Sequence, residues 1–106
     1  MLTLSRKNDQ LDITHVSEGT GREIAYSFSN DFLPATTIRH VNDLGIFLEK
    51  DVTYILNSSD DSVIVELLHK LDSERHSGYI FSDELQKTYL IEFIHLLTKM
   101  RFRNTV

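Results

Sequence analysis

Two segments of the chain pair a glutamate with a histidine three residues later, Glu66 with His69 and Glu92 with His95. This Glu-x-x-His spacing occurs in dinuclear iron and manganese sites, where two such pairs point into a helical bundle and two further helices each add a glutamate. The chemistry therefore depends on whether both pairs point inward.

The helical positions of the two pairs predict that both face water. At about 100° per residue, the later pair shares a narrow polar stripe with Thr88 and Lys99, away from the apolar side of its helix. The earlier pair also lies opposite the apolar side of its helix. We predict surface residues, no metal and no cofactor, and keep a Glu-x-x-His metal-binding protein as a remote alternative.

The other polar residues give little support to an enzyme. One polar stretch gathers Glu74, Arg75 and His76, which could act as acid and base on a phosphodiester. No second histidine can be placed beside them, so we interpret the stretch as a solvated connector. His15 and His40 are interpreted as structural or surface residues, and no P-loop, Gly-x-Ser-x-Gly, Gly-x-Gly-x-x-Gly or His-Glu-x-x-His pattern occurs. We predict that the chain is not an enzyme.

The composition predicts one globular domain, residues 1–106. Hydrophobic residues make up 41% and charged residues 25%, close to the averages of folded proteins. There is no cysteine, which fits a reducing compartment, so we expect a cytoplasmic location. No apolar run approaches the roughly 18 residues that cross a bilayer, and the basic residues of the N-terminus follow its apolar ones. We expect neither a membrane span nor a signal peptide.

Charge is distributed unevenly along the chain. Residues 43–92 hold eleven acidic and four basic side chains, a net charge of −7, whereas residues 93–106 hold three basic side chains and no acidic one. The acidic part would repel nucleic acid and attract a basic protein, and such complementarity speeds the encounter of two partners. We therefore favour a basic protein partner over nucleic acid.

Residues 1–29 alternate apolar and polar side chains in three segments, as half-buried strands do. Residues that form tight turns lie between the segments, Asn8 and Asp9 in the first gap, Gly19 and Gly21 in the second. A small meander cannot cover its own apolar face. We predict an α+β fold in which an N-terminal three-stranded antiparallel meander packs against two to four C-terminal helices.

Residues 35–57 fit two interpretations. Their apolar residues follow helical spacing on both sides of Gly45, which predicts a kink or a boundary there, and Pro34 suits a first helical turn. Their β-branched residues favour strand instead, and residues 46–48 could form one. Helix and strand therefore both stay open for this segment.

Helices are predicted at about 60–72, after a hydroxyl cap, and at about 83–101, with a short strand at 79–81 between them. Apolar residues cover about two-thirds of the circumference of the last helix. That helix is therefore either sandwiched within its own domain or in contact with another chain, for example in a homodimer.

We expect a small acidic intracellular protein that occludes a basic partner, as an inhibitor, an immunity-type antitoxin or an adaptor does. Reversing Asp72 and Glu74 to lysine is expected to slow association without unfolding the domain. The alternative is a winged-helix-like DNA-binding regulator that uses the basic C-terminus, although no short turn splits the last helix. The acidic residues expected to contact the partner lie at helix starts and in the adjoining loop: Asp60, Asp61, Asp72, Glu74, Asp83 and Glu84.

Overall fold

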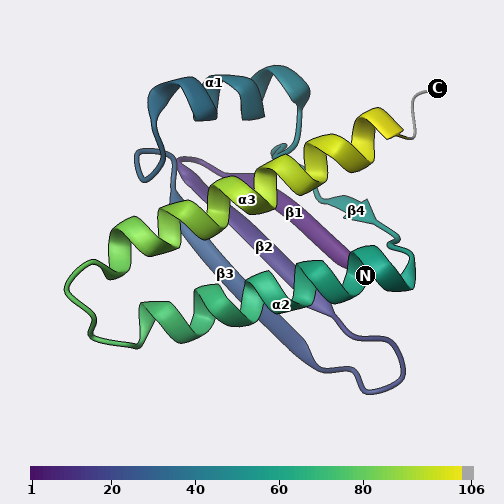
Figure 1. Cartoon of the computed structure of the whole chain (residues 1–106). Helices are drawn as coiled ribbons and strands as arrows, with labels where there is room; N and C mark the ends of the chain where they lie inside the picture. Colours follow the sequence, from purple (N-terminus) through teal and green to yellow (C-terminus); the bar gives the residue numbers. More distant parts are fainter. Residues whose placement is uncertain (104–106) are drawn as a thin grey trace.

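The structure is a computed structural model that describes residues 1–103, with only the backbone at Arg103. Figure 1 shows a sheet whose strands run diagonally beneath the long helices, with a shorter helix across one end. The elements in chain order are β1 (Leu2–Lys7), β2 (Gln10–Val16), β3 (Glu23–Ser29), α1 (Ala35–Leu44), β4 (Val52–Tyr54), α2 (Ser58–Arg75) and α3 (Ser82–Arg103).

The sheet has the strand order β3-β2-β1-β4, and all neighbouring strands are antiparallel. The alternation of the first 29 residues sets its register, because Leu4 pairs with Ile13 and Ile13 with Tyr26, and all three side chains are buried on the same face. The meander and the α+β class are therefore confirmed. β3 is one outer strand of the sheet and β4 is the other.

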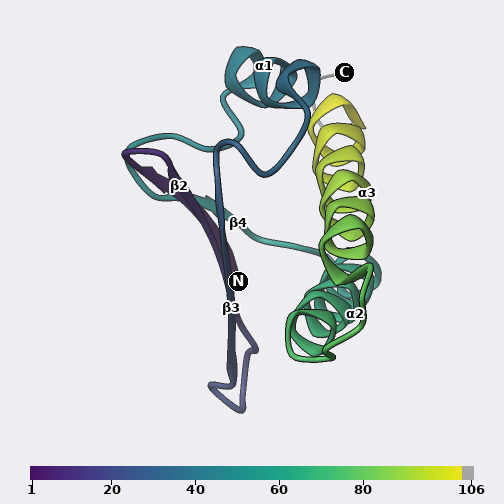
Figure 2. The same cartoon turned by 90° about the vertical axis from the view of Figure 1, so that its left-hand side faces the viewer.

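The helices cover a single face of the sheet. Figure 2 shows α2 and α3 side by side on that face, with α1 beside the C-terminal part of α3. The apolar side of α2 is buried between α3 and the sheet, where each fully buried leucine contributes about 1.5–3 kcal/mol. The core combines residues of all layers: Leu2, Leu4, Leu11, Ile13, Tyr26, Phe28, Leu33, Ile38, Val41, Ile46, Phe47, Ile64, Leu67, Leu68, Leu71, Leu90, Phe93, Ile94, Leu97 and Met100.

The segment 35–57 contains a helix, a loop whose Ile46 and Phe47 are buried, and a short strand. α1 ends where Gly45 adopts a left-handed conformation with a φ of 64°, so the boundary predicted there is confirmed. Residues 46–48 are not a strand, and the helical spacing that continued beyond Gly45 does not form a helix. Val52 pairs instead with Leu4, because the free edge of β1 accepts a strand and the residues of β4 favour one.

The two long helices extend beyond their predicted limits. The cap of α2 is the side chain of Asn57, which accepts a hydrogen bond from the backbone N–H of Asp60 at 2.8 Å, rather than a hydroxyl. The strand predicted at 79–81 is wrong, because these residues form the turn between α2 and α3.

The wide apolar side of α3 packs against other elements of the same chain. α3 lies over the sheet with α2 on one side, and Ile91 and Ile94 on its other side line a groove against Leu44 of α1. These contacts fit the sandwiched arrangement, and the homodimer stays a prediction. None of the helices within residues 1–103 combines the length and the apolar character that crossing a bilayer requires.

Candidate functional site

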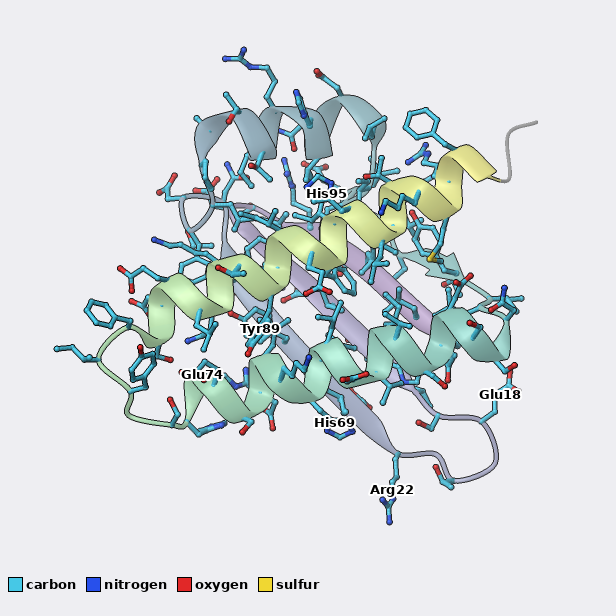
Figure 3. All side chains as sticks on the ribbon, viewed as in Figure 1. Glu18, Arg22, His69, Glu74, Tyr89 and His95 are labelled. Atoms are coloured by element: carbon cyan, nitrogen blue, oxygen red, sulfur yellow. The ribbon has the colours of Figure 1, made fainter. Side chains whose placement is uncertain are left out.

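The two Glu-x-x-His pairs lie on different helices with all four side chains exposed. Glu66 is 3.5 Å from the Lys70 ammonium, and Figure 3 shows His69 on the side of α2 away from α3, whereas His95 lies on the side of α3 toward α1. Among residues 1–103, no group of three or more His, Cys, Asp or Glu side chains is placed to hold a metal ion. The metal alternative therefore gains no support.

Each of the two paired histidines also lines a hollow. One, of about 180 Å³, lies between α1 and α3 and is lined by His40 and His95. The other, of about 520 Å³, lies between the β2–β3 turn and α2 and is lined by Glu18, Arg22 and His69. Figure 3 shows Glu18 and Arg22 pointing away from His69, so these three groups do not converge on one substrate position.

The acidic residues predicted to bind a partner separate into two groups, one at each end of α2. At the N-terminal end, Asp61 Oδ1 is 2.6 Å from Nε2 of His15, a β2 residue whose side chain is only 1% exposed. Asp60 lies in the capped first turn of the helix. Asp61 therefore joins α2 to the sheet.

The other four acidic residues lie together where α2 ends and α3 begins. We call residues 72–84 the hairpin end; Figure 1 shows that it projects beyond β3, the outer strand. Arg75 is its only lysine or arginine, which gives it a formal net charge of −3. Its acidic residues are Asp72, Glu74, Asp83 and Glu84.

Three consecutive apolar residues are exposed in the middle of this acidic group. Tyr79 is 51% exposed, Ile80 83% and Phe81 56%. The rings of Tyr79 and Phe81 meet edge to face, with centroids 5.8 Å apart. The aromatic and β-branched residues of this turn favour strand and so hid it in the sequence, whereas the neighbouring Gly78 and Ser82 are the signals that would have indicated a turn.

Local hydrogen bonds hold the turn in one shape. Gly78 has a φ of 72°, which only glycine adopts at little cost. The Ser77 hydroxyl donates to the Glu74 carboxylate at 2.8 Å and accepts from the backbone N–H of Tyr79 at 3.1 Å. The ring Nδ1–H of His76 donates to the carbonyl of Asp72 at 2.8 Å. The side chains of Glu74 and His76 therefore help to fix the conformation of the turn.

A chain of hydrogen bonds ties the hairpin end to the sheet. The buried hydroxyl of Tyr26 on β3 donates to Gln86 Oε1 at 2.7 Å. Gln86 Nε2 donates to the Ser82 hydroxyl at 3.1 Å, and that hydroxyl donates to the carbonyl of Glu74 at 2.7 Å. All three hydrogen bonds run in the same direction from Tyr26 to Glu74, an arrangement in which successive bonds strengthen one another.

Arg75 lies between the hairpin end and β3. Its guanidinium donates to Asp72 Oδ1 at 2.6 Å and to the carbonyl of Ala25 at 3.4 Å, and it lies 5.6 Å from the ring centroid of Tyr26. Burial raises the pKa of Tyr26 to about 12; Asp83 adds to the rise and the Arg75 charge opposes it. Glu74, Arg75 and His76 are therefore each engaged in hydrogen bonds within the fold.

Comparison with protein-family models, curated proteins and solved structures finds no match to this chain. The winged-helix alternative gains no support from the fold, since α3 is one continuous helix and residues 79–81 form a turn instead of a strand. The hairpin end thus combines an exposed apolar turn with four acidic residues that flank it in the sequence.

Proposed function

We propose that this chain is a cytoplasmic, non-catalytic protein-binding module that occludes a basic partner protein, as an inhibitor, an immunity-type antitoxin or an adaptor does. The observation that carries the proposal is the hairpin end, where an exposed apolar turn is flanked in the sequence by four acidic residues, two of them exposed. The acidic residues would attract a basic partner from a distance, and the apolar turn would exclude water from the interface at contact.

The four acidic residues differ in how freely they can meet a partner. Asp83 and Glu84 are exposed in the first turn of α3, whereas Asp72 is paired with Arg75 and Glu74 accepts from Ser77. Lysine at position 72 or 74 would also remove a bond that shapes the hairpin end. Neutralising Asp83 and Glu84 therefore tests the role of charge in binding more cleanly than reversing Asp72 and Glu74 to lysine does.

The experiment begins with affinity purification from the native cell and identification of the captured protein by mass spectrometry. Association of the purified partner is then measured for the wild type and for the double variant Asp83→Asn, Glu84→Gln. We expect association to slow about three- to tenfold at low salt, with a smaller difference at high salt, because fewer charges steer the encounter.

A matched control removes the same charge elsewhere. Asp43 and Glu49 are exposed residues in and after α1, so the double variant Asp43→Asn, Glu49→Gln should associate at nearly the wild-type rate. Equal slowing by both double variants would show that only overall charge matters and would exclude the hairpin end as the contact surface.

A further inference from the structure

We infer that Tyr79, Ile80 and Phe81 form an apolar anchor that inserts into a nonpolar pocket of the basic partner, while the acidic residues around them meet a basic rim of that pocket. The inference rests on the proposed function and adds which residues supply the affinity. In protein interfaces a few buried aromatic and aliphatic residues carry most of the binding energy, and charges at the rim mainly set the rate of encounter.

Among residues 1–103, the turn differs from the other exposed apolar positions because its three large apolar side chains are consecutive. Ile55 is 89% exposed, but the residues beside it are Tyr54 and Leu56, both partly buried. In the turn, three consecutive large apolar side chains are all more than half exposed. Single exposed apolar residues are common on protein surfaces, whereas a contiguous exposed group marks an interaction site.

The anchor is also held ready for binding. The bonds of Ser77 and the positive φ of Gly78 fix the turn, and the Tyr26–Gln86–Ser82 chain fixes the turn to the sheet. The backbone N–H of Ser82 donates to the carbonyl of Tyr79 at 3.0 Å, which closes the turn itself. A pre-organised loop loses less conformational entropy on binding, so its apolar contacts are converted into affinity more completely.

The surrounding charge selects the class of partner. Within residues 72–84, the carboxylates outnumber the single arginine, so an anionic membrane surface is repelled. A second copy of the chain would bring the same carboxylates against each other. A pocket with a basic rim in a different protein satisfies both the charges and the exposed apolar group.

The experiment compares two matched substitutions, Ile80→Ser in the turn and Ile55→Ser at the other end of α2. Both positions are more than four-fifths exposed, so both variants should unfold at nearly the wild-type temperature. Against the purified partner, we expect Ile80→Ser to raise the dissociation rate about 10- to 100-fold with little change in association rate. Ile55→Ser should change the dissociation rate less than about twofold.

Phe81→Ser is a second variant for the same site and should also speed dissociation. Unchanged dissociation in both turn variants, together with slowed association in Asp83→Asn, Glu84→Gln, would remove the anchor and leave the proposed function standing. A wild-type chain that captures no basic protein would remove both.

Two further measurements identify a different occupant. Sedimentation with vesicles of phosphatidylcholine alone, and with added phosphatidylserine, tests for a membrane. Light scattering at increasing protein concentration tests for a second copy. Binding to either vesicle, or dimerisation that Ile80→Ser abolishes, would overturn the assignment to a basic protein partner.

Discussion

The two ends of α2 carry the same kind of sequence, acidic side chains beside a helix start, yet the structure uses them differently. At the N-terminal end, Asp61 faces β2 and pairs with buried His15. At the hairpin end, Asp83 and Glu84 begin a helix that projects beyond β3 and are exposed. What lies opposite an acidic residue therefore decides whether it fastens the fold or is available to a partner.

The link between the hairpin end and the sheet should be lost at high pH. Tyr26 has a pKa of about 12 when folded, whereas an unfolded chain releases this proton near pH 10. The stability that the Tyr26 hydroxyl contributes is complete below pH 10 and is lost as the pH rises from 10 to 12. The expected loss is about 1.4 kcal/mol per pH unit in that window, measured by urea unfolding at pH 9 to 11.5.

The variant Tyr26→Phe isolates this effect, because it removes the ionising hydroxyl and keeps the ring beneath Arg75. Its stability should be lower at neutral pH, since Gln86 loses its donor, but should decline less steeply above pH 10. Equal slopes for the two proteins would show that Tyr26 titrates normally.

The N-terminal end should depend on its acidic residue more than the hairpin end does. Asp61→Ala leaves a buried nitrogen of His15 without its partner and should lower the free energy of unfolding by about 1–3 kcal/mol. Glu84→Ala removes only a favourable interaction with the helix dipole, about 0.3–1 kcal/mol. Denaturant titrations at pH 7 measure both, and a larger loss at Glu84 would reverse the assigned roles.

The smallest expected effect concerns Arg75. Its ion pair with Asp72 is partly exposed, so Arg75→Ala should lower the free energy of unfolding by less than about 1 kcal/mol. The carbonyl of Ala25 on the outer strand would lose its cover, and an uncovered strand edge favours self-association. Light scattering at high concentration should therefore show more aggregation than in the wild type, whereas unchanged scattering would assign Arg75 a purely local role.

The sequence predicted the elements whose signals are local. The meander follows from a strict two-residue alternation, and α3 follows from a long run of helical spacing with acidic residues in its first turn. Both signals concern neighbours in the chain, so they do not depend on how the chain folds back.

The features that were missed depend on contacts between distant residues. Val52 to Tyr54 becomes a strand because β1 offers it a free edge, and His15 is buried against Asp61, 46 residues later in the chain. The six acidic residues looked equivalent in the sequence because nothing local indicates which of them lie over the sheet. The exposed turn was misread for a different reason, since its aromatic and β-branched residues favour strand wherever they occur.

The hydrogen-bond chain from Tyr26 to the carbonyl of Glu74 gives the molecule a natural spectroscopic reporter. A hydroxyl proton buried in such a chain exchanges slowly with water, so it is expected to give its own line in an NMR spectrum. Because the chain passes through Ser82, the residue that follows Phe81, a molecule docking on the turn would shift a resonance that belongs to β3. Occupancy at the surface could then be followed from the interior, without any attached label.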